Sequence, residues 1–357
     1  MTLIIAEAGV NHNGNEDLAL ALVEAAYQAG ADVVKFQTFI ASNLVTPVAK
    51  QAEYQTKNTH RQESQLSMLQ RLELSHATHH KLTEYCDELG IEFLSTAFDG
   101  DSLHFLASVL GLRRLKIPSG ELTNAPFILD HARTGCDLIL STGMASLAEI
   151  EAALSVIAFG YLAESNSVPS TEGFMEAYTS SEGRECIKNR VTVLHCTTEY
   201  PAPVDEVNLR VMDTLSQAFD VNVGYSDHTS GIAIPIAAVA RGARLIEKHF
   251  TLDRSMEGPD HRASLEPREF DAMVKSIREI EAALGSPVKM PTNSELKNRE
   301  VARKSLVAAG PISQGDIFSK GNIAIKRPGS GVSPYLYWEY MGRRASRDYQ
   351  AGDIIVD

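Results

Sequence analysis

Eight short apolar runs, each ending in a cluster of polar or charged residues, recur along the first part of this 357-residue chain. Strands that are buried on both faces read as continuous apolar runs, which is typical of parallel sheets. Segments with a helical hydrophobic period separate the runs, so the sequence predicts alternating strand and helix units. Eight such units predict a closed (β/α)8 TIM barrel of the α/β class, with the active site at the rim where the strands end. The runs are residues 3–14, 32–38, 91–99, 113–121, 138–144, 191–201, 222–229 and 244–251.

The chain is longer than such a barrel requires, and its composition changes after the last helical period. We expect the catalytic barrel to occupy residues 1–284. Residues 285–298 contain two prolines and no hydrophobic period, which predicts a linker. Residues 299–357 are short β-like runs interrupted by glycine and proline, which predicts a small β-rich domain. A domain of about sixty residues has a marginal core of its own, so we expect it to dock on something larger.

Two segments interrupt the barrel pattern. Residues 40–75 are long and polar, and they form either a lid or subunit contact at the rim or a solvated excursion. Residues 160–190 are rich in Ser, Glu and Gly and precede the sixth run. Because they approach the barrel from the end opposite the rim, we expect them to be structural decoration.

Composition argues against several classes of function. A net charge of −13 opposes binding to nucleic acid or to an anionic membrane, while a local cluster of lysines still permits a small anionic substrate. The sequence shows no apolar stretch of about 18 residues and no basic leader with a cleavage site, so we expect a cytoplasmic protein. The four cysteines have no C-x-x-C spacing, which is typical of buried thiols in a reducing compartment.

Histidines end the last two runs, which the barrel places side by side. His228 and His249 are each accompanied by a carboxylate, Asp227 and Glu247. Neighbouring strands lie about 4.8 Å apart, so two imidazoles at matched height can converge on one divalent ion. Two protein ligands leave positions open for water and substrate, which suits Lewis-acid activation of a carbonyl. The alternative is that each histidine only bonds a neighbouring carbonyl at its strand end.

Lysines end the second and fourth runs. Lys35 and Lys116 lie within apolar surroundings, where a charge is costly unless a partner balances it. Two lysines inside the mouth of a barrel indicate an anionic substrate or a Schiff base. Hydroxyl groups and accessible backbone N–H groups on the same rim suit phosphate and carboxylate oxygens. These residues are Ser119, Gly120, Ser141, Thr142, Gly143, Thr197, Thr198 and Ser226.

Two carboxylates complete the candidate site. Glu7 ends the first run, which adjoins His249 once the barrel closes, and Glu121 ends the fourth. Carboxylates at these positions can bind sugar hydroxyls or exchange protons. The alternative is that they pair with Lys35 and Lys116 for structural reasons alone.

These motifs resemble one family, the sialic acid (N-acetylneuraminate, nonulosonate) synthases, which condense phosphoenolpyruvate with an N-acetylated hexosamine. Nearly the whole chain shares the resemblance, apart from residues 160–190. In the tail, ARKSLVA and IKRPGSGVSP resemble the family's C-terminal antifreeze-like (SAF) domain. The resembling barrel segments are IIAEAGVNHNG, VVKFQTF, LSTAFD, LKIPSGEL, ILSTGM, LHCTTEYPAP, GYSDHT, EKHFTLD and GPDHRASLEP.

The resemblance implies roles for individual residues. His228 and His249 match a pair that binds Mn²⁺ or Mg²⁺, and Arg327 matches an arginine that one subunit inserts into the other's barrel, near the N-acyl group. It therefore implies a domain-swapped homodimer. Thr198 stands where some members carry Asn, so its role as a phosphate contact is the weakest transfer. Lys35, Thr96, Lys116, Ser119, Ser141, Thr198 and Ser226 match residues that hold phosphoenolpyruvate, and Glu7, Gln37, Glu121, Tyr200 and Asp260 match residues of the amino-sugar pocket.

We therefore expect a transferase that joins phosphoenolpyruvate to open-chain N-acetylmannosamine, giving N-acetylneuraminate and phosphate. In this hypothesis Lys35 and Lys116 neutralise the carboxylate and phosphate, and Glu7 and Glu121 exchange protons. The alternative in the same family is an N,N'-diacetyllegionaminate synthase acting on a 2,4-diacetamido-6-deoxy hexose, because the rim motifs suit both acceptors. A non-enzymatic ice- or glycan-binding protein is disfavoured by the reactive residues at all eight run ends.

Overall fold

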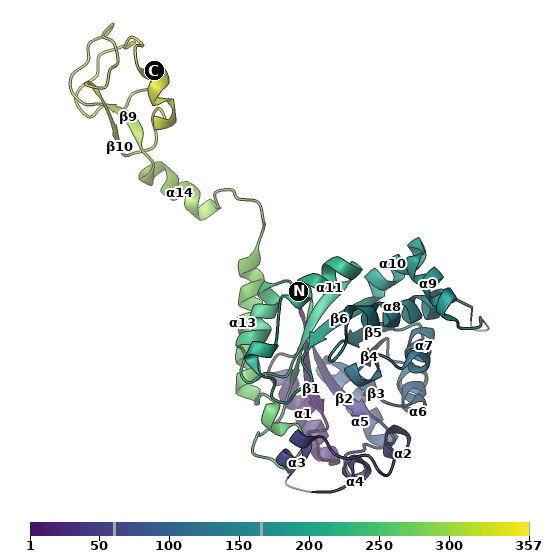
Figure 1. Cartoon of the computed structure of the whole chain (residues 1–357). Coiled ribbons are helices and arrows are strands. Elements are labelled where there is room, and N and C mark those ends of the chain that lie inside the picture. Colours follow the sequence, from purple (N-terminus) through teal and green to yellow (C-terminus); the bar gives the residue numbers. More distant parts are fainter. Residues whose placement is uncertain (60–61, 165–166, 357) are drawn as a thin grey trace. The chain divides into compact units, whose positions relative to one another are not determined.

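The computed structural model describes residues 1–59, 62–164 and 167–356. Its first compact unit, Met1–Gly285, is a closed barrel of eight parallel strands in the order β1 to β8, which confirms the predicted fold (Figure 1). Each apolar run of the sequence matches one strand, and only β5 begins before its run, by one residue. The strands are β1 Leu3–Gly9, β2 Val33–Thr38, β3 Glu92–Ala97, β4 Arg114–Ile117, β5 Asp137–Ser141, β6 Val191–Cys196, β7 Asn222–Asp227 and β8 Leu245–His249.

Helices on the outside of the barrel connect consecutive strands. Their ends follow ordinary capping chemistry: Ser146 and Glu149 form a capping box at the start of α8, and Gly90 ends α5 with φ +79°. The helices that cover the barrel are α1 Glu16–Gln28, α5 His76–Leu89, α6 Gly100–His104, α7 Ala125–Arg133, α8 Leu147–Leu162, α11 Val211–Phe219, α12 Ala233–Ala240 and α13 Pro267–Leu284.

The barrel interior is built in layers, because side chains on a strand alternate between its two faces. The lower layer is a separate apolar cluster formed by Ile5, Val33, Leu94, Ile139, Leu194 and Leu245. Two residues further along the same strands stand Glu7, Lys35, Thr96, Ser141, Cys196 and Glu247. The apolar layer closes the barrel from below, and the alternation places polar and charged side chains at the rim above it.

Two insertions extend this core. Residues between β2 and α5 form three short helices, α2 Ala41–Leu44, α3 Glu53–Thr59 and α4 Gln65–Gln70. Residues before β6 form α9 Thr171–Thr179 and α10 Ser181–Arg190, which contact α8. None of the residues of α9 or α10 lines the cavity at the rim, so the structure gives them no part in it.

The second compact unit, Ser286–Asp357, has its own small apolar cluster. It contains the antiparallel pair β9 Ser305–Ala308 and β10 Ile323–Lys326, and the short helix α15 Tyr337–Tyr340. The predicted linker, residues 285–298, is not irregular throughout, because helix α14 Asn293–Ala302 begins within it. Thr292 and Glu295 cap that helix, a local signal within a stretch that has no apolar period.

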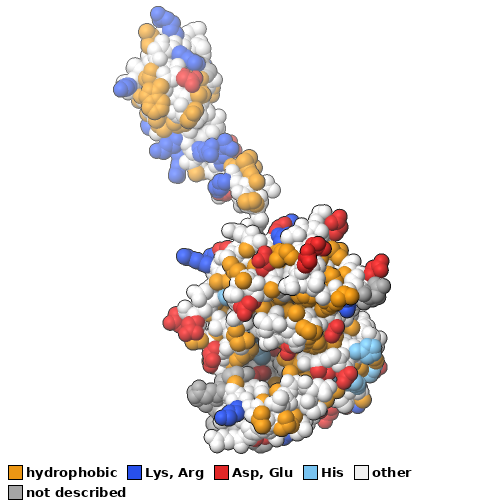
Figure 2. All heavy atoms as spheres, turned by 45° about the vertical axis from the view of Figure 1, so that its right-hand side comes forward, with side chains coloured by type: hydrophobic (Ala, Val, Ile, Leu, Met, Phe, Trp, Pro, Cys, Tyr) orange, Lys and Arg blue, Asp and Glu red, His pale blue; other side chains and the backbone are white. Residues whose placement is uncertain are grey.

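Charge is divided unevenly between the two units. Residues 286–357 contain eleven Lys and Arg against seven Asp and Glu, so the second unit is basic and the barrel carries all of the chain's excess negative charge. Figure 2 shows Lys and Arg side chains spread over the second unit and Asp and Glu over the visible face of the barrel. None of the helices in the described part of the chain is long and apolar enough to span a membrane.

Candidate active site

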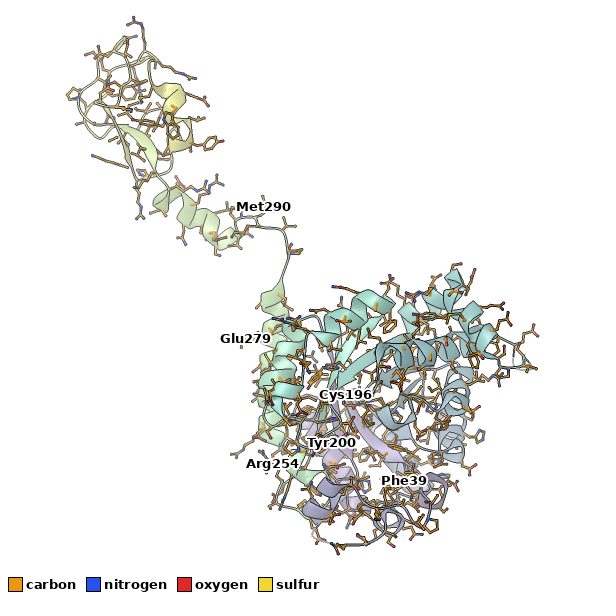
Figure 3. The ribbon with its side chains drawn as sticks, viewed as in Figure 1. Phe39, Cys196, Tyr200, Arg254, Glu279 and Met290 are labelled. Carbon is orange, nitrogen blue, oxygen red and sulfur yellow. The ribbon has the colours of Figure 1, made fainter. Side chains whose placement is uncertain are left out.

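A cavity of about 370 Å³ lies at the ends of the barrel strands and is lined by residues from all eight of them or from the loops that follow. Figure 3 marks three of the lining residues, Phe39, Cys196 and Tyr200, which come from the ends of β2 and β6. Most of the barrel residues that we predicted for the site line this cavity: Glu7, Lys35, Gln37, Thr96, Lys116, Ser119, Gly120, Glu121, Ser141, Thr198, Tyr200, Ser226, His228, His249 and Asp260. Three residues that we expected among the anion-binding groups at the rim, Thr142, Gly143 and Thr197, do not line it.

Four buried charges, which we call the charged floor, lie at the base of the cavity: Lys35, Lys116, Glu7 and Glu247. Lys116 Nζ donates to both carboxylate oxygens of Glu247 at 2.8 Å. Lys35 Nζ lies 2.7 Å from Glu7 Oε2 and 3.7 Å from Glu247 Oε2. Each side chain is almost wholly buried, so every charge depends on its partners for stabilisation. The two lysines therefore face the cavity already paired with carboxylates.

The surroundings shift the pKa values of these four groups in different directions. Burial acts to raise the pKa of Glu247, but the positive charges of Lys116 and Lys35 outweigh it and hold that pKa well below its usual range. Burial acts to lower the pKa of Lys35, and the charges of Glu247 and Glu7 more than reverse it. Burial lowers the pKa of Lys116, which has one close carboxylate partner, and raises the pKa of Glu7. Glu247 is thus an anion and Lys35 a cation, and burial disfavours the charged forms of the other two.

Hydroxyl groups line the β4–β6 side of the cavity, and the backbone of Gly143 packs against them. Gly143 N donates to Ser119 Oγ at 2.9 Å, and Ser119 Oγ lies 3.3 Å from Cys196 Sγ. A Cβ atom at Gly143 would lie 2.1 Å from Thr198 Oγ1, so the backbone approaches this wall more closely than any side chain allows. Small donors packed this tightly suit the oxygens of a phosphate or carboxylate.

Two further predicted anion contacts already bond to the charged floor. Thr96 Oγ1 accepts a hydrogen bond from Lys35 Nζ at 3.0 Å, and Ser226 Oγ donates to Glu247 Oε1 at 2.9 Å. Both hydroxyls are buried. They hold the charged groups in one geometry, which lowers the entropic cost of binding an anion there.

The β1–β2 side of the cavity carries the residues predicted for the amino sugar. Gln37 Nε2 donates to Glu7 Oε1 at 3.1 Å. Asp260 is buried close enough to Glu7 to feel its charge; burial and, secondarily, that charge raise the pKa of Asp260 to about 7. A carboxyl group with this pKa is substantially protonated at neutral pH, so it can donate a hydrogen bond. Glu121 lies at the rim. Its hydrogen-bond donor there is Asn124 Nδ2, at 2.7 Å, and not a lysine.

The two histidines lie next to each other on one wall of the cavity. The ring centroids of His228 and His249 are 5.5 Å apart, and both rings are buried. His228 Nδ1 lies 2.6 Å from the carbonyl oxygen of Thr197, which assigns the ring proton to Nδ1 and leaves Nε2 as an acceptor. Burial lowers the pKa of both imidazoles, so both are neutral. The ring of Tyr200 packs 4.2 Å from that of His228 and 5.5 Å from that of His249.

This pair has the donor chemistry of an open metal site. Neutral imidazoles are the form that binds divalent ions, and the buried Nδ1 atom of His249 has no hydrogen-bond partner among the described residues. Within residues 1–59, 62–164 and 167–356, no group of three or more His, Cys, Asp and Glu side chains is placed to hold a metal. An ion bound here would therefore take two protein ligands and complete its coordination with water or substrate, as in a catalytic site.

Sequence reasoning missed two parts of the cavity. It placed Glu247 beside the metal pair, whereas the structure places its carboxylate between Lys35 and Lys116. Its sequence signal is its position two residues before His249, which puts both side chains on the inner face of β8. The apolar residues on the β1–β3 side were also missed, because they lie on loops and on α4 and give no periodic signal.

Arg327 is the one predicted site residue outside the barrel unit. It is exposed and directly follows β10 in the second unit. The resemblance placed Arg327 in the barrel of a partner subunit, and that assignment stays a prediction.

Comparison with known proteins agrees with the geometry. The sequence profile of the NeuB family matches residues 22–289, and that of the SAF domain matches residues 303–357. The chain is 48% identical to N,N'-diacetyllegionaminic acid synthase from Campylobacter jejuni, covering 99% of this chain and 98% of that protein. It is 44% identical to N,N'-diacetyllegionaminic acid synthase from Legionella pneumophila, covering 99% and 93% of the two chains.

A solved structure supports the same assignment. N-acetylneuraminic acid (sialic acid) synthetase from Leptospira borgpetersenii, crystallised with citrate, is 31% identical and superposes with a TM-score of 0.66. The match covers 83% of this chain and 90% of that chain. With its family profile, its full-length relatives and its charged barrel cavity in agreement, the chain belongs to the NeuB family and carries a C-terminal SAF domain.

Proposed function

We propose that this protein is an N,N'-diacetyllegionaminate synthase that condenses phosphoenolpyruvate with a 2,4-diacetamido-6-deoxy hexose and releases phosphate. The observation that carries the choice of acceptor is full-length identity of 48% and 44% to two N,N'-diacetyllegionaminic acid synthases, against 31% to the sialic acid synthetase. It favours our alternative expectation over N-acetylmannosamine. The charged floor supports the other substrate, because paired lysines and small hydroxyl donors suit an anion with a carboxylate and a phosphate.

The reaction has a balanced course in this cavity. C3 of phosphoenolpyruvate forms a bond to C1 of the open-chain sugar as the C1 carbonyl π bond breaks, and the C1 oxygen takes up a proton. Water adds at C2 and loses a proton, and the resulting C2 hydroxyl group loses its proton as the bond between C2 and the phosphate oxygen breaks, which leaves a C2 ketone and releases phosphate. Lys35 and Lys116 hold the carboxylate and the phosphate, and Ser119, whose hydroxyl oxygen accepts a hydrogen bond from Gly143 N, lines the adjoining side of the cavity. The closed apolar layer below the charged floor keeps bulk water out from beneath.

Proton transfer is assigned to carboxyl groups on the β1 side. The pKa of Asp260, raised to about 7, lets this carboxyl group carry a proton near neutral pH, and burial also raises the pKa of Glu7; both groups face the cavity. Gln37 positions Glu7 through a hydrogen bond. Glu121, at the rim, would bind sugar hydroxyls.

We also propose that His228 and His249 hold Mn²⁺ or Mg²⁺. When bound, the ion supplies Lewis-acid polarisation of the sugar carbonyl. Tyr200 packs on both rings and restricts their orientation. Thr197 holds His228 in the tautomer that leaves Nε2 available.

The decisive experiment is turnover by the metal-treated protein with phosphoenolpyruvate and a panel of amino sugars, followed by phosphate release and product mass. We expect the 2,4-diacetamido-6-deoxy hexose to be used with a higher kcat/KM than N-acetylmannosamine. A chelator should stop turnover and Mn²⁺ should restore it, while borohydride with either substrate should leave the protein mass unchanged. Preference for N-acetylmannosamine would contradict the acceptor, and a trapped lysine adduct would contradict the roles of Lys35 and Lys116.

A further inference from the structure

One side of the cavity is apolar and separate from the main hydrophobic core. We call this surface the apolar wall; it consists of Val10, Phe39, Leu44, Met68, Leu69, Leu72 and Phe98, which form a hydrophobic cluster of their own. Every member of this cluster lines the cavity. The cavity thus has a charged floor on one side and an apolar wall on another. In phosphoenolpyruvate only the two carbons of the double bond are apolar, so this substrate does not account for the wall.

The wall is the next layer of the barrel above the charged floor. Along β2 and the residue after it, Lys35, Gln37 and Phe39 follow each other at a spacing of two and face the same cavity. Thr96 and Phe98 repeat the pattern at β3. The rings of Phe39 and Phe98 meet edge to face, with centroids 6.2 Å apart. A substrate that rises from the charged floor past Gln37 therefore meets apolar side chains next.

The excursion between β2 and α5 supplies the rest of the wall and is fastened to the rim. Ile40 N donates to Asp99 Oδ2 at 2.9 Å, and Ala41 N donates to Glu73 Oε1 at 2.6 Å. On the far side, Asn58 Nδ2 donates to the carbonyl oxygen of Pro259 at 2.7 Å. These contacts hold Met68, which is 1% exposed, against the cavity.

We propose that the apolar wall binds the C6 methyl group and the methyl group of the C4 acetamide of the acceptor, and that it sets the preference for this sugar. The inference rests on the proposed function and names the residues that determine the specificity for the acceptor sugar. Carbons 4 to 6 are the part of an open-chain hexose farthest from the C1 carbonyl, which reacts at the charged floor. Methyl groups gain from contact with the wall, whereas hydroxyl groups placed there lose hydrogen bonds to water.

The first test uses the unaltered protein and a pair of acceptors. The diacetamido hexose with a C6 methyl group is compared with the same sugar carrying a C6 hydroxyl group. We expect kcat/KM to fall by about 10- to 100-fold for the hydroxyl analogue, with the KM for phosphoenolpyruvate unchanged. Equal kcat/KM values for the two sugars would overturn the proposal without any variant.

The second test changes the wall. Leu69→Gln places an amide on the wall, and Leu74→Gln is its control, because Leu74 is half-buried in the same segment but packs on the main core and does not line the cavity. We expect Leu69→Gln to reduce the preference for the 6-deoxy diacetamido sugar over its 6-hydroxy analogue by about tenfold or more, with an unchanged KM for phosphoenolpyruvate. Leu74→Gln should keep the wild-type preference.

Thermal unfolding of both variants shows whether folding is intact. A folded Leu69→Gln protein with the wild-type acceptor preference would refute the role of the wall, and so would an equal loss of preference in Leu74→Gln. Failure of the proposed function looks different: the unaltered protein would then use N-acetylmannosamine better than the diacetamido hexose, or neither sugar, before any wall residue is changed.

Discussion

Among single residues, Asp260 combines deep burial with a pKa near neutrality. The raised pKa of about 7 is caused by burial and by the charge of Glu7. If the protonated carboxyl group donates to an oxygen of the acceptor, the KM for the sugar should rise as the pH increases from 6 to 8. Asp260→Asn keeps a donor at every pH, so its KM should change much less over this range. Initial rates at varied sugar concentration and pH test this, and parallel profiles for both proteins would contradict it.

The same carboxyl group affects folding stability. Its folded-state pKa lies above the unfolded value of about 3.9, so between those pH values the unfolded chain binds fewer protons than the folded one. Stability contributed by protonated Asp260 is therefore present at low pH and lost as the pH rises toward 7, by up to about 1.4 kcal/mol per pH unit. Relative to Asp260→Asn, the wild type should lose unfolding free energy between pH 5 and 7. Urea unfolding at each pH measures the difference, and a constant difference would contradict the assignment.

Gly143 is constrained by its neighbours rather than by an unusual φ angle. A Cβ atom there would lie 2.1 Å from Thr198 Oγ1 and 2.9 Å from Ser119 Oγ, so both hydroxyls must move in Gly143→Ala. We expect kcat/KM for phosphoenolpyruvate to fall by about 10- to 100-fold, because misplaced donors lose about 1–3 kcal/mol of binding. Gly100→Ala is the control, because Gly100 does not line the cavity and a methyl group there meets open space. Unchanged kcat/KM in Gly143→Ala would show that the hydroxyl groups of Ser119 and Thr198 do not contact the substrate.

At the scale of elements, the turn after β7 is held by a wholly buried ion pair. Lys248 Nζ on β8 lies 2.6 Å from Asp227 Oδ2, and Asp227 Oδ1 accepts hydrogen bonds from both the N–H and the hydroxyl of Thr229. His228 stands between these two anchored residues. The ion pair therefore fixes the turn that presents one of the two proposed metal ligands, although it lies outside the cavity itself.

Removal of one member of this pair should be costly. Asp227→Asn leaves the Lys248 ammonium buried without a counter-charge, and we expect a loss of about 3–5 kcal/mol of unfolding free energy. Asp213→Asn is the matched control, because its ion pair with Arg241 joins neighbouring elements but is partly exposed; it should cost at most about 1 kcal/mol. Urea unfolding of both variants gives the comparison. Similar losses of unfolding free energy in the two variants would show that burial of the Lys248–Asp227 pair does not increase the cost of removing one partner.

Elements also show what the sequence can and cannot predict. All eight strands can be predicted from local apolar runs, because a strand that is buried on both faces has apolar residues at consecutive positions. Glu247 and Lys248 are adjacent charges in one such run; strand alternation puts Glu247 on the face of His249 and Lys248 on the other, but the sequence does not show that Glu247 pairs with Lys116 and Lys248 with Asp227. The apolar wall depends on contacts such as that of Asn58 with Pro259, separated by 201 positions, which leave no pattern in the sequence.

At the scale of the whole molecule, the barrel unit is acidic and the second unit is basic. The resemblance implies that the SAF domain of one subunit inserts Arg327 into the barrel of another. The opposite net charges of the two units are compatible with that prediction.

A mixing experiment tests the proposed domain-swapped homodimer. Arg327→Ala retains an intact cavity, and His249→Ala retains an intact Arg327. If the arginine crosses between subunits, co-expressed chains should recover about a quarter of the wild-type activity, because half of the dimers are mixed and each has one complete site. Activity no greater than that of the two variants alone, with mixed dimers verified by mass, would contradict the exchange.

The mutual neutralisation of Lys35, Lys116, Glu7 and Glu247 has a consequence for descent within the family. Replacement of any one of these residues leaves a buried charge without its partner, so we expect the four to change together, whereas the leucines of the excursion can be replaced without stranding a charge. Lineages should accordingly keep the donor substrate while exchanging one sugar for another.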